Sequence, residues 1–361
     1  MDENLAMMWL FRAMRGNNKK VKQLLRGFGQ AEMLWHCSPN DLRQMEWMEE
    51  DMVRDLMAAK DHLDQWQEEM EQTGVRYVSV HDETFPQWLR EVYDAPVGLF
   101  VQGELPTEQQ KCISMIGTRR SSAYGRAMGY DLAKALAQDG FTIISGMAEG
   151  IDSICHRGAL DGGGKTIAVL GFGHKECYPA RNRSLKEEIA AKGTLVSEYP
   201  PSTHSGKHTF PRRNRIIAGL SQLLIVVEAG KRSGTLITVD FALDAGRTVM
   251  TFPSNITNPL SVGTNQLIQQ GCPIITCKED VYAELGWQKP IQKEEETILP
   301  LPPLTKQEQL VYQAIETEPV SMEHLVQTVP LPVAEIQSLL TMLELYGLVE
   351  RLPQERYRKL S

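Results

Sequence analysis

The fold is decided by the stretch Cys112-Ile-Ser-Met-Ile-Gly-Thr-Arg-Arg-Ser-Ser-Ala-Tyr-Gly125. An apolar run typical of a buried strand ends at Gly117, which permits a sharp exit of the backbone. Hydroxyl and cationic side chains follow, and a helical pattern begins near Tyr124. A helix that starts directly after a strand presents free N–H groups and partial positive charge to an anion. This unit predicts an α/β fold with a phosphate site at the carboxyl end of a strand.

The same alternation of strand and helix continues on both sides of this unit. Apolar strands are predicted at Ile113–Ile116, Thr142–Ser145, Thr166–Leu170, Leu195–Ser197, Leu223–Val227, Thr248–Phe252 and Ile274–Thr276. Helical patterns separate them at Tyr124–Gln138, Ile151–Leu160, Ser184–Lys192, Thr235–Asp244 and Thr264–Gln270. Such a series indicates a Rossmann-like, doubly wound, mostly parallel sheet covered on both faces. We assign residues 73–286 to this core.

Two smaller domains are predicted to flank the core. Residues 1–72 alternate apolar and charged positions at helical spacing, which predicts a small helical domain, SAM/HhH-like in size and content. Residues 287–303 are acidic and rich in proline, as in a linker. In residues 304–361 the capping box Thr305-Lys-Gln-Glu308 opens the first of three helices, and a hairpin follows them. Three helices and a hairpin predict a winged helix.

Composition indicates a cytoplasmic globular protein. The longest apolar runs are far shorter than the roughly 20 residues of a membrane span, and the N-terminus lacks the pattern of a signal peptide. The six cysteines form no CxxC pair, so we expect reduced thiols and neither a metal nor a cofactor. A net charge of −8 argues against general affinity for nucleic acid.

Two basic segments without acidic residues nevertheless predict a local anion site. Residues 110–130 contain four cations, and residues 199–227 contain four more. The second segment includes Lys207-His-Thr-Phe-Pro-Arg-Arg-Asn-Arg215, in which Phe210 and Asn214 stand among the cations. Cations with an aromatic platform are the usual chemistry of single-strand binding. Phe210 is either a core residue or exposed on a loop, and the neighbouring Pro211 and charges favour the loop.

Other motifs carry less weight. The run from Gly158 to Thr166 nearly matches a Walker A loop, but it precedes a strand, whereas a P-loop follows one. Asp152 and His156 stand one helical turn apart and could perform acid–base chemistry. A capping aspartate and a hydrogen-bonded structural histidine are the favoured interpretation.

An ordered series of motifs resembles the DNA-processing protein A (DprA/Smf) family. The series consists of Gly117-Thr-Arg119, Ser145-Gly-Met-Ala-Glu-Gly-Ile-Asp152 with His156, Ala168-Val-Leu-Gly171, Tyr178-Pro179, Ser197-Glu198, Phe210-Pro-Arg-Arg-Asn-Arg-Ile-Ile-Ala-Gly219 and Ser233-Gly-Thr-Leu-Ile-Thr238. The similarity is strong over about residues 75–286. It departs from the usual pattern at Pro253-Ser254 and Gly271-Cys272, near the expected association surface.

The resemblance implies a homodimer that binds single-stranded DNA, protects incoming DNA and loads the RecA recombinase onto it during natural transformation. It implies that the association surfaces lie at about residues 235–270. With the basic patterns above, it gives a set of expected DNA- and phosphate-binding residues: Gly117, Thr118, Arg119, Arg120, Lys207, Phe210, Arg213, Asn214 and Arg215.

Two alternatives remain open beside a non-enzymatic DNA-binding protein. The fold also resembles nucleoside-monophosphate phosphoribohydrolases, but Thr238 stands where those enzymes carry a catalytic glutamate, so no enzymatic activity is expected. A winged helix could also read DNA as in a transcription factor. Its third helix contains two glutamates and neither lysine nor arginine, which is a poor surface against phosphates.

Overall fold

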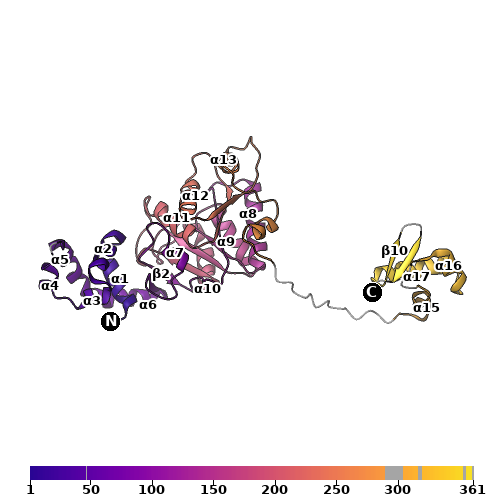
Figure 1. The fold of residues 1–361 in the computed structure, drawn as a ribbon, viewed down its shortest axis with the longest axis horizontal. Coiled ribbons are helices and arrows are strands. Elements are labelled where there is room, and N and C mark those ends of the chain that lie inside the picture. The colour runs from indigo at the N-terminus through magenta and orange to yellow at the C-terminus, as the bar shows by residue number, and fades with distance from the viewer. Residues whose placement is uncertain (46, 289–303, 316–318, 353–354, 360–361) are drawn as a thin grey trace. The chain divides into compact units, whose positions relative to one another are not determined.

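The computed structural model describes residues 1–45, 47–288, 304–315, 319–352 and 355–359. It divides into two compact units, Met1–Gln288 and Lys289–Ser361, whose elements are labelled in Figure 1. The predicted linker, residues 287–303, lies outside the described residues from position 289 onward.

The first unit is built on an eight-stranded sheet with the order β1-β2-β6-β5-β4-β3-β7-β8. Its strands are β1 (Arg76–Ser79), β2 (Gly98–Gln102), β3 (Cys112–Gly117), β4 (Thr142–Ser145), β5 (Thr166–Leu170), β6 (Thr194–Ser197), β7 (Leu223–Glu228) and β8 (Thr248–Thr251). β3 to β8 run parallel, and only β1 and β2 join antiparallel. The expected doubly wound, mostly parallel sheet is therefore confirmed.

Helices cover both faces of the sheet. They are α7 (Gln87–Arg90), α8 (Ala123–Gln138), α9 (Ile151–Asp161), α10 (Arg183–Lys192), α11 (Thr209–Gly219), α12 (Thr235–Asp244), α13 (Val262–Gln269) and α14 (Lys278–Glu284). Side chains alternate along β3: Ile113 and Met115 pack in the cluster with α8 and α9, and Cys112 and Ile116 pack in the cluster with α11 and α12. This two-residue period with both faces buried explains the continuous apolar runs of the sequence.

Two sequence expectations at the end of the core are corrected. The strand predicted at Ile274–Thr276 is only an isolated bridge between Thr251 and Ile274. Trp287, which the sequence pattern places in the linker, packs edge-on against Phe141 and Tyr282 at centroid distances of 4.9 and 4.5 Å. Packing of this partly buried ring on the core outweighs the acidic and proline-rich composition that follows it.

The N-terminal helical region shares a hydrophobic core with the edge of the sheet. It contains α1 (Glu3–Ala13), α2 (Asn18–Phe28), α3 (Ala31–His36), α4 (Pro39–Arg43), α5 (Glu50–Lys60) and α6 (Leu63–Thr73). Trp9 and Leu56 belong to the same buried cluster as Tyr77 of β1 and Phe100 of β2. These helices are therefore packed on the core and are not an independently buried module.

The second unit is a winged helix. It comprises α15 (Lys306–Ala314), β9 (Val320–Ser321), α16 (Met322–Thr328), α17 (Val333–Leu345), β10 (Val349–Leu352) and β11 (Arg356–Lys359). The sheet order is β10-β11-β9, and the predicted capping box between Thr305 and Glu308 is present. Across the described part of the chain, no helix has the length and apolarity needed to cross a bilayer.

Candidate nucleic-acid interface

The topology creates a crevice where β3 and β7 end side by side. The chain leaves β3 toward β4 on one side of the sheet order and leaves β7 toward β8 on the other. Doubly wound proteins bind ligands at such a switch point, beyond the carboxyl ends of the strands. A cavity of about 570 Å³ lies there. The β3–α8 loop, α11 and the beginning of α12 line it.

The cavity brings together seven of the predicted site residues. These are Gly117, Thr118, Arg119, Lys207, Phe210, Arg213 and Asn214. Lys207 and Arg119 are exposed cations, and each comes from a different one of the two basic segments. Arg120 lies instead in a neighbouring groove lined also by Arg119, Arg126 and Arg181. The two basic segments of the sequence thus meet at one end of the sheet.

Phe210 is half-buried and has polar and aromatic neighbours. The guanidinium carbon of Arg119 lies 5.5 Å from its ring centroid, and the centroid of Tyr178, which is 46% exposed, lies 5.4 Å away. The ring rests on Gly171, where an added Cβ would lie 2.8 Å from the Phe210 Cδ1 atom. A nucleic-acid base could stack on such a supported, partly open ring.

The segment that carries Phe210 is helical, which corrects the loop expected there. α11 begins at Thr209, so Phe210 and Pro211 stand in its first turn. Proline is tolerated in a first turn because the N–H that it lacks would have no partner within the helix. The charges and the proline therefore mark a helix start.

The N-terminus of α8 does not offer the anion site expected from the sequence. The buried carboxylate of Glu228, at the end of β7, accepts a hydrogen bond from the Ser122 N–H at 2.8 Å, and Ser122 Oγ accepts one from the Gly125 N–H at 3.0 Å. A Cβ on Gly125 would lie 2.8 Å from a Glu228 carboxylate oxygen. The chain's own carboxylate thus occupies the position that a phosphate would take.

Arg213 is buried and holds backbone carbonyls. Its Nη1 donates to the carbonyl oxygens of Gly146 and Val169, and its Nε donates to Asn214 Oδ1 at 3.1 Å. Burial lowers the pKa of Arg213 to about 10, although the carboxylate of Asp152 opposes this shift. Arg213 therefore forms part of the cavity wall with most of its donors already used.

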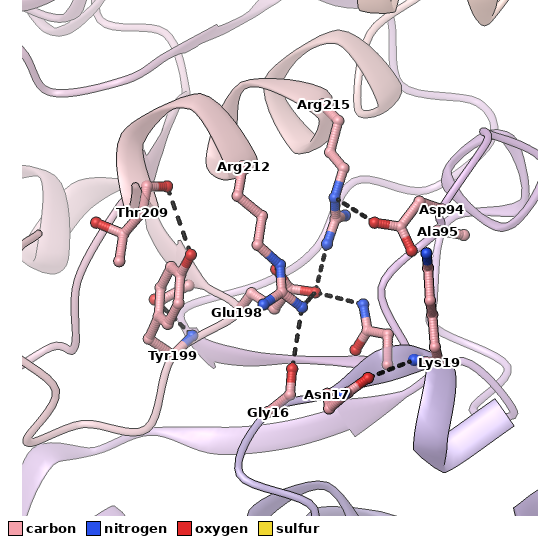
Figure 2. Close-up of polar contacts among 12 residues, drawn as sticks. Gly16, Asn17, Lys19, Asp94, Ala95, Glu198, Tyr199, Thr209, Arg212 and Arg215 are labelled. Atoms are coloured by element: carbon pink, nitrogen blue, oxygen red, sulfur yellow. Dashed lines mark hydrogen bonds and ion pairs between the residues drawn. The ribbon is translucent and has the colours of Figure 1, made fainter. Parts of the chain in front are cut away.

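Arg215 is turned away from the cavity, which corrects its expected contact with phosphate. Its side chain is 3% exposed, its Nη2 pairs with Glu198, and its Nε lies 3.5 Å from Asp94 Oδ2. Figure 2 shows this ion pair beside Arg212, which also points toward Glu198. A guanidinium without an exposed edge cannot bind a DNA backbone, so Arg215 instead holds α11 to Glu198 and Asp94.

Asp152 and His156 have structural partners. Asp152 Oδ2 accepts a hydrogen bond from the Ala148 N–H at 3.3 Å. His156 Nδ1 lies 2.7 Å from Thr166 Oγ1, which itself donates to the Ile143 carbonyl, so the histidine is the donor. Burial lowers the pKa of His156 to about 3. These contacts fit the structural interpretation of the pair.

Several cavity residues were missed by the sequence reasoning. They are Ile116, Ala148, Tyr178, Pro211, Ile217, Ser233, Gly234, Thr235, Ile237 and Thr238. Thr235 and Thr238 are buried at the start of α12. The sequence did contain a signal for these residues, because the loops that follow parallel strands all emerge at the same edge of the sheet. Across the described ranges, no group of three or more histidine, cysteine or acidic side chains could hold a metal ion.

The fold and the cavity together define a doubly wound α/β protein with a cationic and aromatic site at its switch point. The family model described as "DNA recombination-mediator protein A" matches residues 76–286, and that of the "DprA winged helix domain" matches residues 295–355. Protein Smf of Synechocystis is 32% identical in an alignment 375 positions long, gaps included, which covers 94% of this chain and 94% of that protein. The chain therefore belongs to the DprA/Smf family of DNA-processing proteins.

Two solved structures support this assignment. The X-ray structure of DNA processing protein A from Streptococcus pneumoniae has a TM-score of 0.67 at 33% identity and covers 78% of this chain and 97% of its own. DNA processing protein A from Helicobacter pylori, whose structure addresses a single-stranded DNA binding mode, has a TM-score of 0.52 at 28% identity. That match covers 59% of this chain and 97% of the other.

Proposed function

We propose that this protein binds single-stranded DNA at the switch-point cavity, without catalysing a reaction on it. The observation that carries the proposal is the meeting of Arg119, Lys207 and Phe210 on one cavity. The cations neutralise phosphates, and the ring of Phe210 stacks on a base that a duplex would keep paired. The relative from Helicobacter pylori is described as binding single-stranded DNA, which supports this assignment.

The proposal predicts a preference for single strands that does not depend on base sequence. If about three or four phosphates are neutralised, log K falls with log salt concentration at a slope of roughly −2 to −3 per protomer. The contacts come from side-chain cations and from stacking. Neither type of contact distinguishes the four bases by their hydrogen-bonding edges.

A salt titration of single- and double-stranded oligonucleotides tests this function. The wild type should bind the single strand more tightly, and Lys207→Ala should weaken binding and reduce the salt slope by about one. Glu279→Ala is a control because Glu279 is an exposed residue of α14 that does not line the cavity. Equal affinity of the wild type for both DNA forms would refute the proposal.

We further propose that the protein protects incoming DNA and loads RecA onto it as a homodimer in the cytoplasm, during transformation or recombination. Family membership supports this role. Exposed apolar side chains at Leu243 (55%), Ile256 (87%) and Ile274 (44%) support self-association over and after α12. Light scattering with Leu243→Glu tests the dimer. RecA filament growth on DNA covered by a single-strand-binding protein tests the loading.

The non-enzymatic proposal rests on the polar groups of the cavity. Thr238 cannot act as a carboxylate base near neutral pH. Asp152, the carboxylate that lines the cavity, is engaged with the Ala148 N–H and stands beside Arg213. Incubation of the purified protein with AMP should release no base. Release that is abolished in an Asp152→Asn variant would restore the phosphoribohydrolase alternative.

A further inference from the structure

The segment that carries Lys207 and Phe210 is held at both ends by the N-terminal helical region. This segment, residues 198–212, runs from the end of β6 into the first turn of α11. One contact joins Gly16 and Asn18, at the start of α2, to the two ends of the segment at Arg212 and Glu198. The other joins α6 to Ser202. Lys207 lies between the two contacts.

The first contact is a buried polar network around Glu198, which is 1% exposed. Its Oε1 accepts a hydrogen bond from Asn18 Nδ2 at 2.8 Å, and its Oε2 lies 3.1 Å from Arg212 Nε. Arg212 also donates from Nη2 to the carbonyl oxygen of Gly16 at 3.0 Å, as Figure 2 shows. The start of α2 and the first turn of α11 therefore both bond to the carboxylate of Glu198.

The second contact centres on Glu69 of α6, whose side chain is 11% exposed. The Ser202 hydroxyl donates to Glu69 Oε1, and Lys175 Nζ lies 3.5 Å from the same oxygen. Arg12 of α1 donates from Nη1 to Glu69 Oε2 at 3.0 Å, and its guanidinium carbon lies 4.2 Å from the ring centroid of Trp66. Glu69 of α6 thus bonds to three other segments of the chain, at Arg12, Lys175 and Ser202.

We infer that the N-terminal helical region positions the DNA-binding segment, with Asn18 and Glu69 as positioning residues that touch no DNA. This inference rests on the proposed binding of single strands. Residues 199–208 contain two prolines, a glycine and no strand or helix. They are also hydrogen-bonded to the loop that carries Gly173 and Glu176. The two contacts restrict where α11 begins, and α11 supports Phe210. Loss of the contacts lowers the fraction of molecules that present Lys207 and Phe210 together.

The test removes the Asn18 and Ser202 hydrogen bonds, one from each contact, without leaving a buried charge unpaired. In Asn18→Ala/Ser202→Ala, Glu198 keeps Arg212 and Arg215, and Glu69 keeps Arg12. If the competent state falls to about 10–20% of molecules, the apparent Kd for a fluorescent single-stranded oligonucleotide rises fivefold to tenfold. The salt slope stays at the wild-type value because no phosphate contact is removed.

The matched control is Ser38→Ala/Asn40→Ala in the same helical region. Both residues are exposed, and Ser38 caps α4, so this pair destabilises the helices without touching residues 198–212. The control should bind DNA as the wild type does. Hydrogen exchange should be faster at the backbone amides of residues 203–212 in Asn18→Ala/Ser202→Ala and unchanged there in the control.

A double-mutant cycle separates positioning from general destabilisation. In a Lys207→Ala/Phe210→Ala background, adding Asn18→Ala/Ser202→Ala should change Kd less than about twofold, because the positioned side chains are absent. An unchanged Kd in Asn18→Ala/Ser202→Ala, or an equal loss in both backgrounds, would overturn the inference. Failure of the wild type to bind single strands would instead refute the proposed function itself, before any variant is compared.

Discussion

The guanidinium carbon of Arg119 lies 5.5 Å from the centroid of the Phe210 ring. The β3–α8 loop supplies the cation, and the first turn of α11 supplies the ring. Arginine planes stack on both aromatic rings and bases. A base that stacks on the Phe210 ring would therefore lie close to a positive charge that can neutralise its own phosphate.

Replacement of Phe210 by alanine should weaken single-strand binding by about 1–3 kcal/mol, because the stacking surface is lost. The measurement is a fluorescence titration at fixed salt concentration. Phe210→Trp, which keeps a ring above Gly171, is the matched control and should retain most of the affinity. An alanine variant that binds like the wild type would show that no base stacks on this ring.

Tyr178 should contribute a second, weaker stacking surface. Its ring is 46% exposed and lies beside Phe210, so Tyr178→Ala should cost about 1 kcal/mol in binding. Tyr178→Phe should have no effect if the ring and not the hydroxyl is used. Loss of affinity in the phenylalanine variant would indicate instead a hydrogen bond from the phenol.

Replacement of Arg215 by leucine should lower stability and leave the salt slope unchanged. The substitution leaves the buried Glu198 with one cationic partner fewer, which typically costs about 3 kcal/mol or more. Urea unfolding measures the stability, and the slope of log K against log salt measures the phosphate contacts. A slope that falls by about one, as expected for Arg119→Ala, would return Arg215 to the phosphate-binding set.

Acid should destabilise the core through two buried histidines. Burial lowers the pKa of His156 to about 3 and that of His174 to about 4. In the unfolded chain both histidines take up a proton near pH 6.5, and in the folded chain they do not. Their contribution to the free energy of unfolding is therefore complete above that pH. Between about pH 6 and the folded-state pKa of each histidine, it falls by up to about 1.4 kcal/mol per histidine for each pH unit.

Urea unfolding of the first unit at pH 7 and pH 5 checks this expectation. His174→Gln should reduce the difference between the two pH values, because one titrating group is removed. His36→Gln is the control, since His36 is exposed. A difference that stays the same in both variants would assign the acid sensitivity to other groups.

Removal of residues 289–361 should leave single-strand affinity within about threefold of the wild type. α17, the third helix of the winged helix, contains Glu335 and Glu344 and neither lysine nor arginine. Such a helix gains little binding free energy from contact with a phosphate backbone. An affinity loss of about tenfold or more would show that the winged helix contributes directly to DNA binding.

Much of the fold could be predicted from the sequence because β3 to β8 are buried on both faces and carry continuous apolar runs. The runs at Thr142–Ser145 and Thr166–Leu170 coincide with β4 and β5. Short edge elements were less predictable. β9 has two residues, Val320 and Ser321, which is too few for any periodic pattern to form.

The sequence predicted which segments form the candidate site. It did not predict in every case the direction in which their side chains point. Lys207 and Arg119 reach the cavity, while Arg215 turns inward. A run of arginines has the same composition whether it faces DNA or a buried carboxylate. The partner of Arg215, Glu198, lies in a different segment, so the choice depends on tertiary packing that local pattern does not contain.

The carboxylate of Glu228 at the start of α8 has a consequence for ligand size. A free nucleotide is held largely through its phosphate, which binds the backbone N–H groups at a helix start. Here the Glu228 carboxylate already accepts the Ser122 N–H at that position. A long polyanion has no such dependence, since it gains affinity by adding modest contacts along its length. We therefore expect free mononucleotides to compete poorly with single-stranded DNA for the proposed site.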